Sequence, residues 1–124
     1  MGDAYGDKVL NRYMGFGAGI ERFAPTGYKP AKPIVELIDE VAKVKDLLGL
    51  EFHYPTEVDE SDVKDVLSRY NIKTVAIAPV LSQEAQWSRG ALSALNEDTR
   101  KRAIVRCRKA IDITRELDSE ILII

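Results

Sequence analysis

A single histidine is the first side chain in this sequence whose type and position could support chemistry. His53 stands in the segment Phe52-His53-Tyr54-Pro55, where an apolar run of residues meets a proline. A histidine at the carboxyl end of a strand can take part in proton transfer. The alternative interpretation is a histidine that closes the end of a strand through its hydrogen bonds. Either role requires that the chain build a strand directly before Pro55.

A single tryptophan is the second candidate. Trp87 lies in the polar stretch Gln83-Glu84-Ala85-Gln86-Trp87-Ser88-Arg89. The flat apolar face of an indole can stack on the C–H groups of a sugar. A tryptophan in this setting can equally anchor its loop onto the protein core, and the sequence leaves both interpretations open.

Other residues with chemical potential have simpler explanations. Cys107, the only cysteine, falls on the apolar face of a predicted helix, where a small buried residue is expected. The acidic residues Asp59, Glu60 and Asp62 suit a helix N-terminus, where negative charge is stabilising. Glu51 we expect to face the helices. No set of side chains has the spacing of a metal site, so we predict no metal ligands in this chain.

Glycines 15, 17 and 19 resemble a dinucleotide fingerprint only superficially. The third glycine comes one residue early, and prolines follow where that motif needs a helix. A run of basic residues invites comparison with nucleic-acid-binding proteins, but acidic residues share the same predicted helix. These basic residues are Arg100, Lys101, Arg102, Arg106, Arg108 and Lys109. We interpret them as a solvated outer face.

Composition and charge narrow the class of protein. The 124 residues are 45% hydrophobic and 31% charged, and the formal net charge is −2. These values are typical of one folded domain and give no strong attraction to nucleic acid or anionic membranes. With one cysteine no intramolecular disulfide can form, and no apolar run reaches the length of a membrane helix. We therefore expect a single cytoplasmic domain over residues 1–124, with residues 1–8 disordered.

Hydrophobic periodicity predicts the elements that position the two candidates. Helices are expected over residues 34–48, 59–70 and 97–117, with Asp59 or Ser61 capping the second and Asn96 or Asp98 the third. Strands are expected near residues 13–17, 50–54, 72–81 and 120–124. Each helix is followed by a turn residue and a strand, with Gly49, Asn71 and Asp118 in the turn positions. This alternation predicts an α/β fold with parallel strands and crossover helices.

About four βα units can form an open doubly wound domain or half of a (β/α)8 barrel. The apolar strand expected at the end of the sequence has no later helix to cover it. An exposed apolar edge strand favours pairing with another chain. We therefore expect half of a barrel that assembles through its strand edges, as a homo-oligomer.

The order of several short motifs resembles the first half of xylose-isomerase-like barrels. The segment Phe52-His53-Tyr54-Pro55 is similar to the end of the family's second strand. The region from Ala78 to Asn96-Glu97-Asp98, with Trp87 inside it and the basic start of the next helix after it, is similar to the third loop and helix. Met14-Gly15-Phe16-Gly17 is a weaker match. Asp118 departs from the glycine usual in the family.

The resemblance implies an activity and a division of labour within the complete enzyme. Such enzymes isomerise or epimerise sugars with a divalent metal (Mg, Mn or Co), whose ligands lie on the fifth to eighth strands. The resemblance implies that His53 is catalytic and that His53 and Trp87 bind the sugar. A chain limited to half of the barrel is expected to be inactive alone, and the alternative function is a non-catalytic half-barrel that self-assembles. A DNA-repair nuclease with the same barrel is disfavoured, because such sites are rich in histidine and this chain has one.

Overall fold

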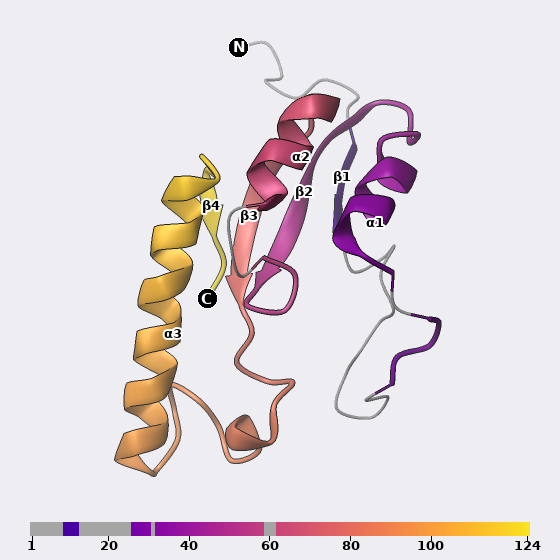
Figure 1. Cartoon of the computed structure of the whole chain (residues 1–124). Coiled ribbons are helices and arrows are strands. Elements are labelled where there is room, and N and C mark those ends of the chain that lie inside the picture. Colours follow the sequence, from indigo (N-terminus) through magenta and orange to yellow (C-terminus); the bar gives the residue numbers. More distant parts are fainter. Residues whose placement is uncertain (1–8, 13–25, 31, 59–61) are drawn as a thin grey trace.

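Strands and helices alternate along the part of the chain that the computed structural model describes, residues 9–12, 26–30, 32–58 and 62–124 (Figure 1). In chain order the elements are β1 (Val9–Arg12), α1 (Ile34–Val41), β2 (Leu47–Tyr54), α2 (Asp62–Tyr70), β3 (Lys73–Pro79), the 3-10 helix η2 (Ala85–Trp87), α3 (Glu97–Glu116) and β4 (Ile121–Leu122). The predicted α/β class is confirmed. No helix among these residues is both long enough and apolar enough to cross a bilayer.

The four strands form one parallel sheet, in which the spatial order β1-β2-β3-β4 is also the order along the chain. Phe52 of β2 lies opposite Ile77 of β3, and Ile77 lies opposite Leu122 of β4. A helix separates each strand from the next, as parallel neighbours require. The carboxyl ends of β2 and β3 therefore meet at the same edge of the sheet (Figure 1).

The helices cover one face of the sheet, because their buried side chains join those of β2 and β3 in one core cluster. The cluster contains Leu37, Ile38, Val41, Leu50, Phe52, Val58, Val63, Val66, Leu67, Ile72, Ile77 and Ala110. Full burial of a side chain such as Phe52 stabilises the fold by about 1.5–3 kcal/mol. Side chains alternate between the two faces of a strand. Glu51 and His53 therefore lie on the face opposite Phe52.

The first helix is shorter than predicted. α1 ends at Val41 and β2 already begins at Leu47, so the predicted helix over residues 34–48 is wrong in its second half. The turn residue is Asp46, with φ of 61°, and not Gly49. Apolar residues of a short buried strand continued the helical pattern, and periodicity alone does not separate the two cases.

The two later helix ends follow the prediction. Asn71 after α2 and Asp118 after α3 both have φ of 52°, the left-handed conformation that stops a helix. At the start of α3, Asn96 rather than Asp98 is the cap, and its side chain accepts a hydrogen bond of 2.9 Å from the backbone N–H of Thr99. Such a cap contributes about 1 kcal/mol.

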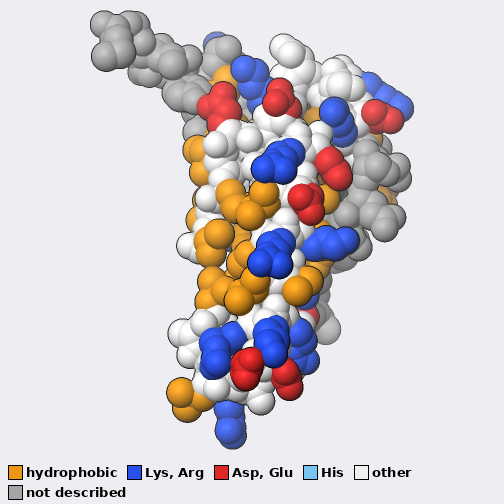
Figure 2. Space-filling view, turned by 90° about the vertical axis from the view of Figure 1, so that its left-hand side faces the viewer, with side chains coloured by type: hydrophobic (Ala, Val, Ile, Leu, Met, Phe, Trp, Pro, Cys, Tyr) orange, Lys and Arg blue, Asp and Glu red, His pale blue; other side chains and the backbone are white. Residues whose placement is uncertain are grey.

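The buried face of α3 is narrower than predicted. Ala103, Cys107 and Ala110 are buried as expected. Ile104 and Ile111, which were also expected in the core, are 44% and 38% exposed. They lie next to the buried residues Ala103, Cys107 and Ala110 on the helix surface. Figure 2 shows this outer side of the molecule, where apolar side chains lie between basic and acidic ones.

Some predictions fall on other parts of the chain. The disorder expected for residues 1–8, the strand expected at residues 13–17 and the caps Asp59 and Ser61 lie outside the described residues. The first described strand is β1, which comes directly before the predicted position. Strands predicted over residues 50–54, 72–81 and 120–124 are present with shifted bounds, as β2, β3 and β4.

Candidate functional site

The turn after β2 holds the backbone of His53 in place. The His53 N–H donates to the Glu57 carboxylate over 2.7 Å. The His53 carbonyl accepts from the backbone N–H groups of Glu57, at 2.9 Å, and Val58, at 3.2 Å. Val58 is itself buried in the core. The strand end that carries the histidine is therefore fixed by three hydrogen bonds and one apolar anchor.

The imidazole of His53 lies beside the carboxylate of Glu51. The His53 side chain is only 7% exposed, and its Nε2 is 3.7 Å from Oε1 of Glu51. The expectation that Glu51 faces the helices is wrong, because residues two apart on a strand share a face. A carboxylate at this distance can orient the imidazole. The pair can donate to, or accept from, an oxygen-rich ligand.

The His53–Glu51 pair does not amount to a metal site. Protein sites for zinc use three or four side-chain ligands, whereas magnesium is held by one or two carboxylates together with water or substrate oxygens. Across the described residues, no three His, Cys, Asp or Glu side chains converge in this way. The resemblance places the ligands of the divalent metal on later strands, and this pair itself offers hydrogen bonding and proton exchange.

Trp87 packs its indole against the helix layer. It is 4% exposed and forms a second apolar cluster with Ala91, Ala103 and the partly buried Leu81. The guanidinium of Arg106 covers the ring at 5.1 Å from its centroid. Such a cation–π contact contributes about 0.5–1 kcal/mol. This packing accounts for the burial of Trp87 as a loop anchor, and the sugar-binding role stays a prediction.

Arg106 ties the loop after β3 to α3. It donates to the Val80 carbonyl over 2.8 Å and pairs with both carboxylate oxygens of Glu84. The Arg106 guanidinium holds the pKa of the Glu84 carboxyl below its usual range, and a hydrogen bond from Gln86 acts in the same direction. The indole N–H of Trp87 also lowers this pKa, although it makes no hydrogen bond of ordinary geometry.

Sequence reasoning missed Glu84 and Arg106 as a structural pair. Arg106 was grouped with a solvated basic face, yet only 16% of its side chain is exposed. Its position directly before buried Cys107, and three residues after buried Ala103, marks the border of the buried face. An arginine at the border of the buried helix face, with an acidic residue in the preceding loop, was the feature of the sequence that could have predicted this pair.

The described structure does not bring His53 and Trp87 into one pocket. Trp87 lines a groove together with Tyr54, whose side chain packs against the core on the helix side of the sheet. His53, one residue earlier on β2, lies on the other face. Burial raises the pKa of the Cys107 thiol, which opposes a role as a nucleophile. Catalytic potential among the candidates therefore stays with His53 and Glu51.

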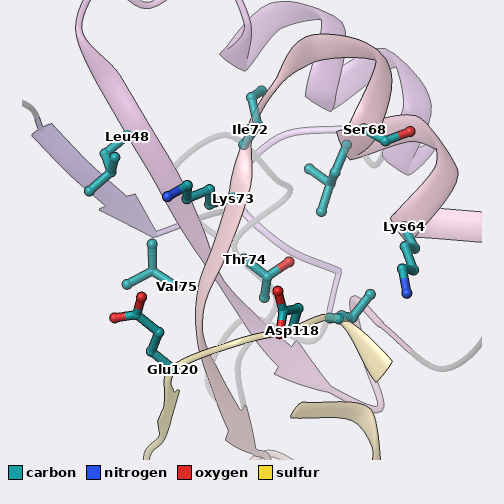
Figure 3. Close-up of a pocket in the computed structure, with 11 residues that line it drawn as sticks. Leu48, Lys64, Ser68, Ile72, Lys73, Thr74, Val75, Asp118 and Glu120 are labelled. Atoms are coloured by element: carbon teal, nitrogen blue, oxygen red, sulfur yellow. The ribbon is translucent and has the colours of Figure 1, made fainter. Parts of the chain in front are cut away.

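A second pocket, of about 250 Å³, opens at the opposite end of the strands between α2, β3 and the start of β4 (Figure 3). Lys73 and Val75 lie on one side of β3, and Thr74 on the other. Both basic and acidic residues line it, including Lys64, Asp118 and Glu120. In open α/β sheets, ligands bind outside the carboxyl ends of the strands. This pocket is at the amino ends and is a weaker candidate.

Comparison with known proteins adds no family assignment. No protein-family model matches the chain, and no curated protein sequence matches it. The resemblance to xylose-isomerase-like barrels therefore depends on the residues and motifs themselves.

Proposed function

We propose that this chain is the first half of a (β/α)8 barrel of the sugar isomerase or epimerase class, to which it supplies His53. The observation that carries the proposal is the place of His53 beside Glu51, at the carboxyl end of β2 on the face opposite the described helix layer. In (β/α)8 enzymes, catalytic side chains come from the carboxyl ends of the strands.

The strand order supports the barrel over the doubly wound alternative. In doubly wound sheets the spatial order of the strands reverses once, so that the first strand lies inside the sheet and not at its edge. Here the spatial order follows the chain from β1 to β4, and the helices share one face. Continuing this pattern closes a sheet into a barrel with helices outside. The opposite face, with Glu51 and His53, then becomes the interior.

The imidazole serves as a hydrogen-bonding and proton-exchanging group for a sugar oxygen. Glu51 orients it, and the turn at Glu57 fixes its backbone. The divalent metal of the complete enzyme would polarise the sugar oxygens, with ligands from beyond this chain. The chain alone is accordingly proposed to bind sugar weakly and to lack turnover.

The single histidine allows a direct test by NMR, because it gives one imidazole signal. Titration of the purified chain with aldoses should shift that signal. The shift should survive the change Thr74→Val, which alters a buried polar residue near the amino end of β3. No shift up to the solubility limit of the sugars would contradict the proposal. In the complete enzyme, His53→Ala is expected to reduce turnover by about 100-fold or more.

The alternative function is a non-catalytic half-barrel that self-assembles. The observation that favours it is the apolar surface of β4 and the residues after it, where Ile121, Ile123 and Ile124 are 47%, 44% and 70% exposed. Both functions predict no turnover by the chain alone, so the sugar titration of the His53 signal separates them, and isomerase assays of the purified chain with Mg, Mn or Co serve as a further check. Robust turnover would exclude the non-catalytic alternative.

A further inference from the structure

A groove of about 420 Å³ runs beside the first half of α3, at the carboxyl end of the sheet. Its volume falls within the range of small-molecule sites. The walls come from the end of β2, from η2 and from one face of α3. The lining residues are Tyr54, Gln86, Trp87, Lys101, Arg102, Val105, Arg106 and Lys109.

The groove is strongly cationic. Four of its lining side chains are basic and none is acidic. Two of the four already have carboxylate partners: Lys101 pairs with Glu97 at 2.9 Å, and Arg106 pairs with Glu84. Arg102 and Lys109 have no carboxylate within ion-pair distance among the described residues. Helical spacing places these two cations two turns apart on one face of α3.

Two exposed cations at this spacing repel each other only weakly in water, and both remain available to an anion that lies between them. A phosphate group carries nearly two negative charges and several acceptor oxygens, which suit an arginine and a lysine together. The rest of the groove includes the polar residues Tyr54 and Gln86. These groups suit the hydroxyls of a small polar ligand.

We propose that this groove binds the phosphate group of a phosphorylated sugar, with Arg102 and Lys109 as the principal ligands. The phosphate part depends only on the charges of the groove. The sugar part rests on the sugar-enzyme class of the proposed function and not on its His53 site, which lies on the other face of the sheet. Nucleic acid fits less well, because Glu97, Asp98, Asp112 and Glu116 share α3 and the whole chain carries a net charge of −2.

The test uses Trp87, the only tryptophan, as a fluorescent reporter inside the groove. The purified chain is titrated at constant ionic strength with inorganic phosphate, glucose 6-phosphate and glucose. Saturable changes in Trp87 emission are expected for both phosphates, with the sugar phosphate binding more tightly, whereas glucose should leave the Trp87 emission unchanged. Calorimetry of the same pairs detects binding that leaves the emission unchanged.

Two double variants with the same net charge distinguish binding by the groove residues from a general effect of the charge of the protein. Arg102→Gln with Lys109→Gln is expected to weaken phosphate binding by about 10-fold or more. Arg108→Gln with Arg115→Gln, which removes two exposed charges of α3 outside the groove, should leave it unchanged. All four side chains are exposed, so both variants should fold, which circular dichroism checks.

Each outcome bears on one part of the proposal. Equal binding of inorganic phosphate and glucose 6-phosphate would overturn the sugar part and support the anion site. Absence of binding, or equal loss in both double variants, would overturn the anion site. If phosphate binding fails while the His53 NMR signal still responds to neutral sugars, the groove proposal falls and the proposed function stands. If phosphate binds but the His53 signal does not respond to neutral sugars, the proposed function is rejected and the phosphate site in the groove stands.

Discussion

Gly49 is required in β2 because the neighbouring strand leaves no space for a side chain at this position. A Cβ atom built at this position would lie 2.4 Å from the Lys73 carbonyl oxygen and 2.6 Å from Cγ2 of Val75. The glycine therefore serves the close approach of β2 to β3. Because backbone atoms cannot move aside cheaply, we expect Gly49→Ala to lower the free energy of unfolding by about 1–3 kcal/mol.

Urea denaturation followed by circular dichroism measures this change. Lys45→Ala, an exposed position before β2, is the control and should alter stability by no more than about 0.5 kcal/mol. A Gly49→Ala variant as stable as the control would mean that the two strands do not approach so closely.

The Glu84–Arg106 pair gives a prediction with a defined pH dependence. The folded state lowers the pKa of Glu84, chiefly through its hydrogen bond from Arg106. The pair therefore stabilises the fold above the ordinary carboxyl pKa, about 4.3, and this stabilisation is lost as the pH falls through the lower folded value. Glu84→Gln should reduce stability at pH 7 by at most about 1 kcal/mol, since Glu84 is partly exposed.

Thermal unfolding of both proteins from pH 7 downward measures the difference. It should shrink toward zero in acid. Glu97→Gln, which removes the exposed pair with Lys101, is the matched control and should have the smaller effect at pH 7. A Glu84→Gln difference that is constant with pH would mean that the carboxylate charge is not what holds the loop.

At the scale of elements, α3 could be predicted almost completely from the sequence. Its start depends on a local cap at Asn96, and its end depends on Asp118, a residue that accepts the left-handed conformation. Both signals are encoded within a few residues of the helix. The same holds for α2 and Asn71. Features of this kind need no knowledge of the partner elements.

The errors arose where contacts between distant elements decide the outcome. α1 ends where it does because the apolar residues that follow it pair with β3 as part of β2. Gly49 is one of these paired residues. Ile104 and Ile111 looked like core residues because periodicity does not show how closely a helix approaches its sheet. The setting of Trp87 likewise needed the arginine of a helix that begins ten residues later. The position of His53 at a strand end was predictable, and the alternation of side chains along a strand could also have placed Glu51 on the same face.

At the scale of the whole molecule, apolar surface gathers on the side formed by α3 and β4 (Figure 2). Ile104, Val105 and Ile111 are exposed on α3, and Ile121, Ile123 and Ile124 are exposed at β4. β4 pairs only with β3, so one of its edges is open within the described sheet. An open strand edge beside exposed apolar side chains favours association with another sheet.

If the sheet is half of a barrel, two copies can cover these surfaces by pairing. We therefore expect light scattering on a size-exclusion column to give a dimer or a larger even assembly, not the 13.9 kDa monomer. Ile104→Lys combined with Ile123→Lys places charge on both parts of the surface and should shift the mass to the monomer. Leu95→Lys, at a fully exposed apolar residue before α3, is the matched control and should leave the assembly intact. A wild-type monomer would mean that the four strands need no partner, and an open α/β domain would then replace the half-barrel.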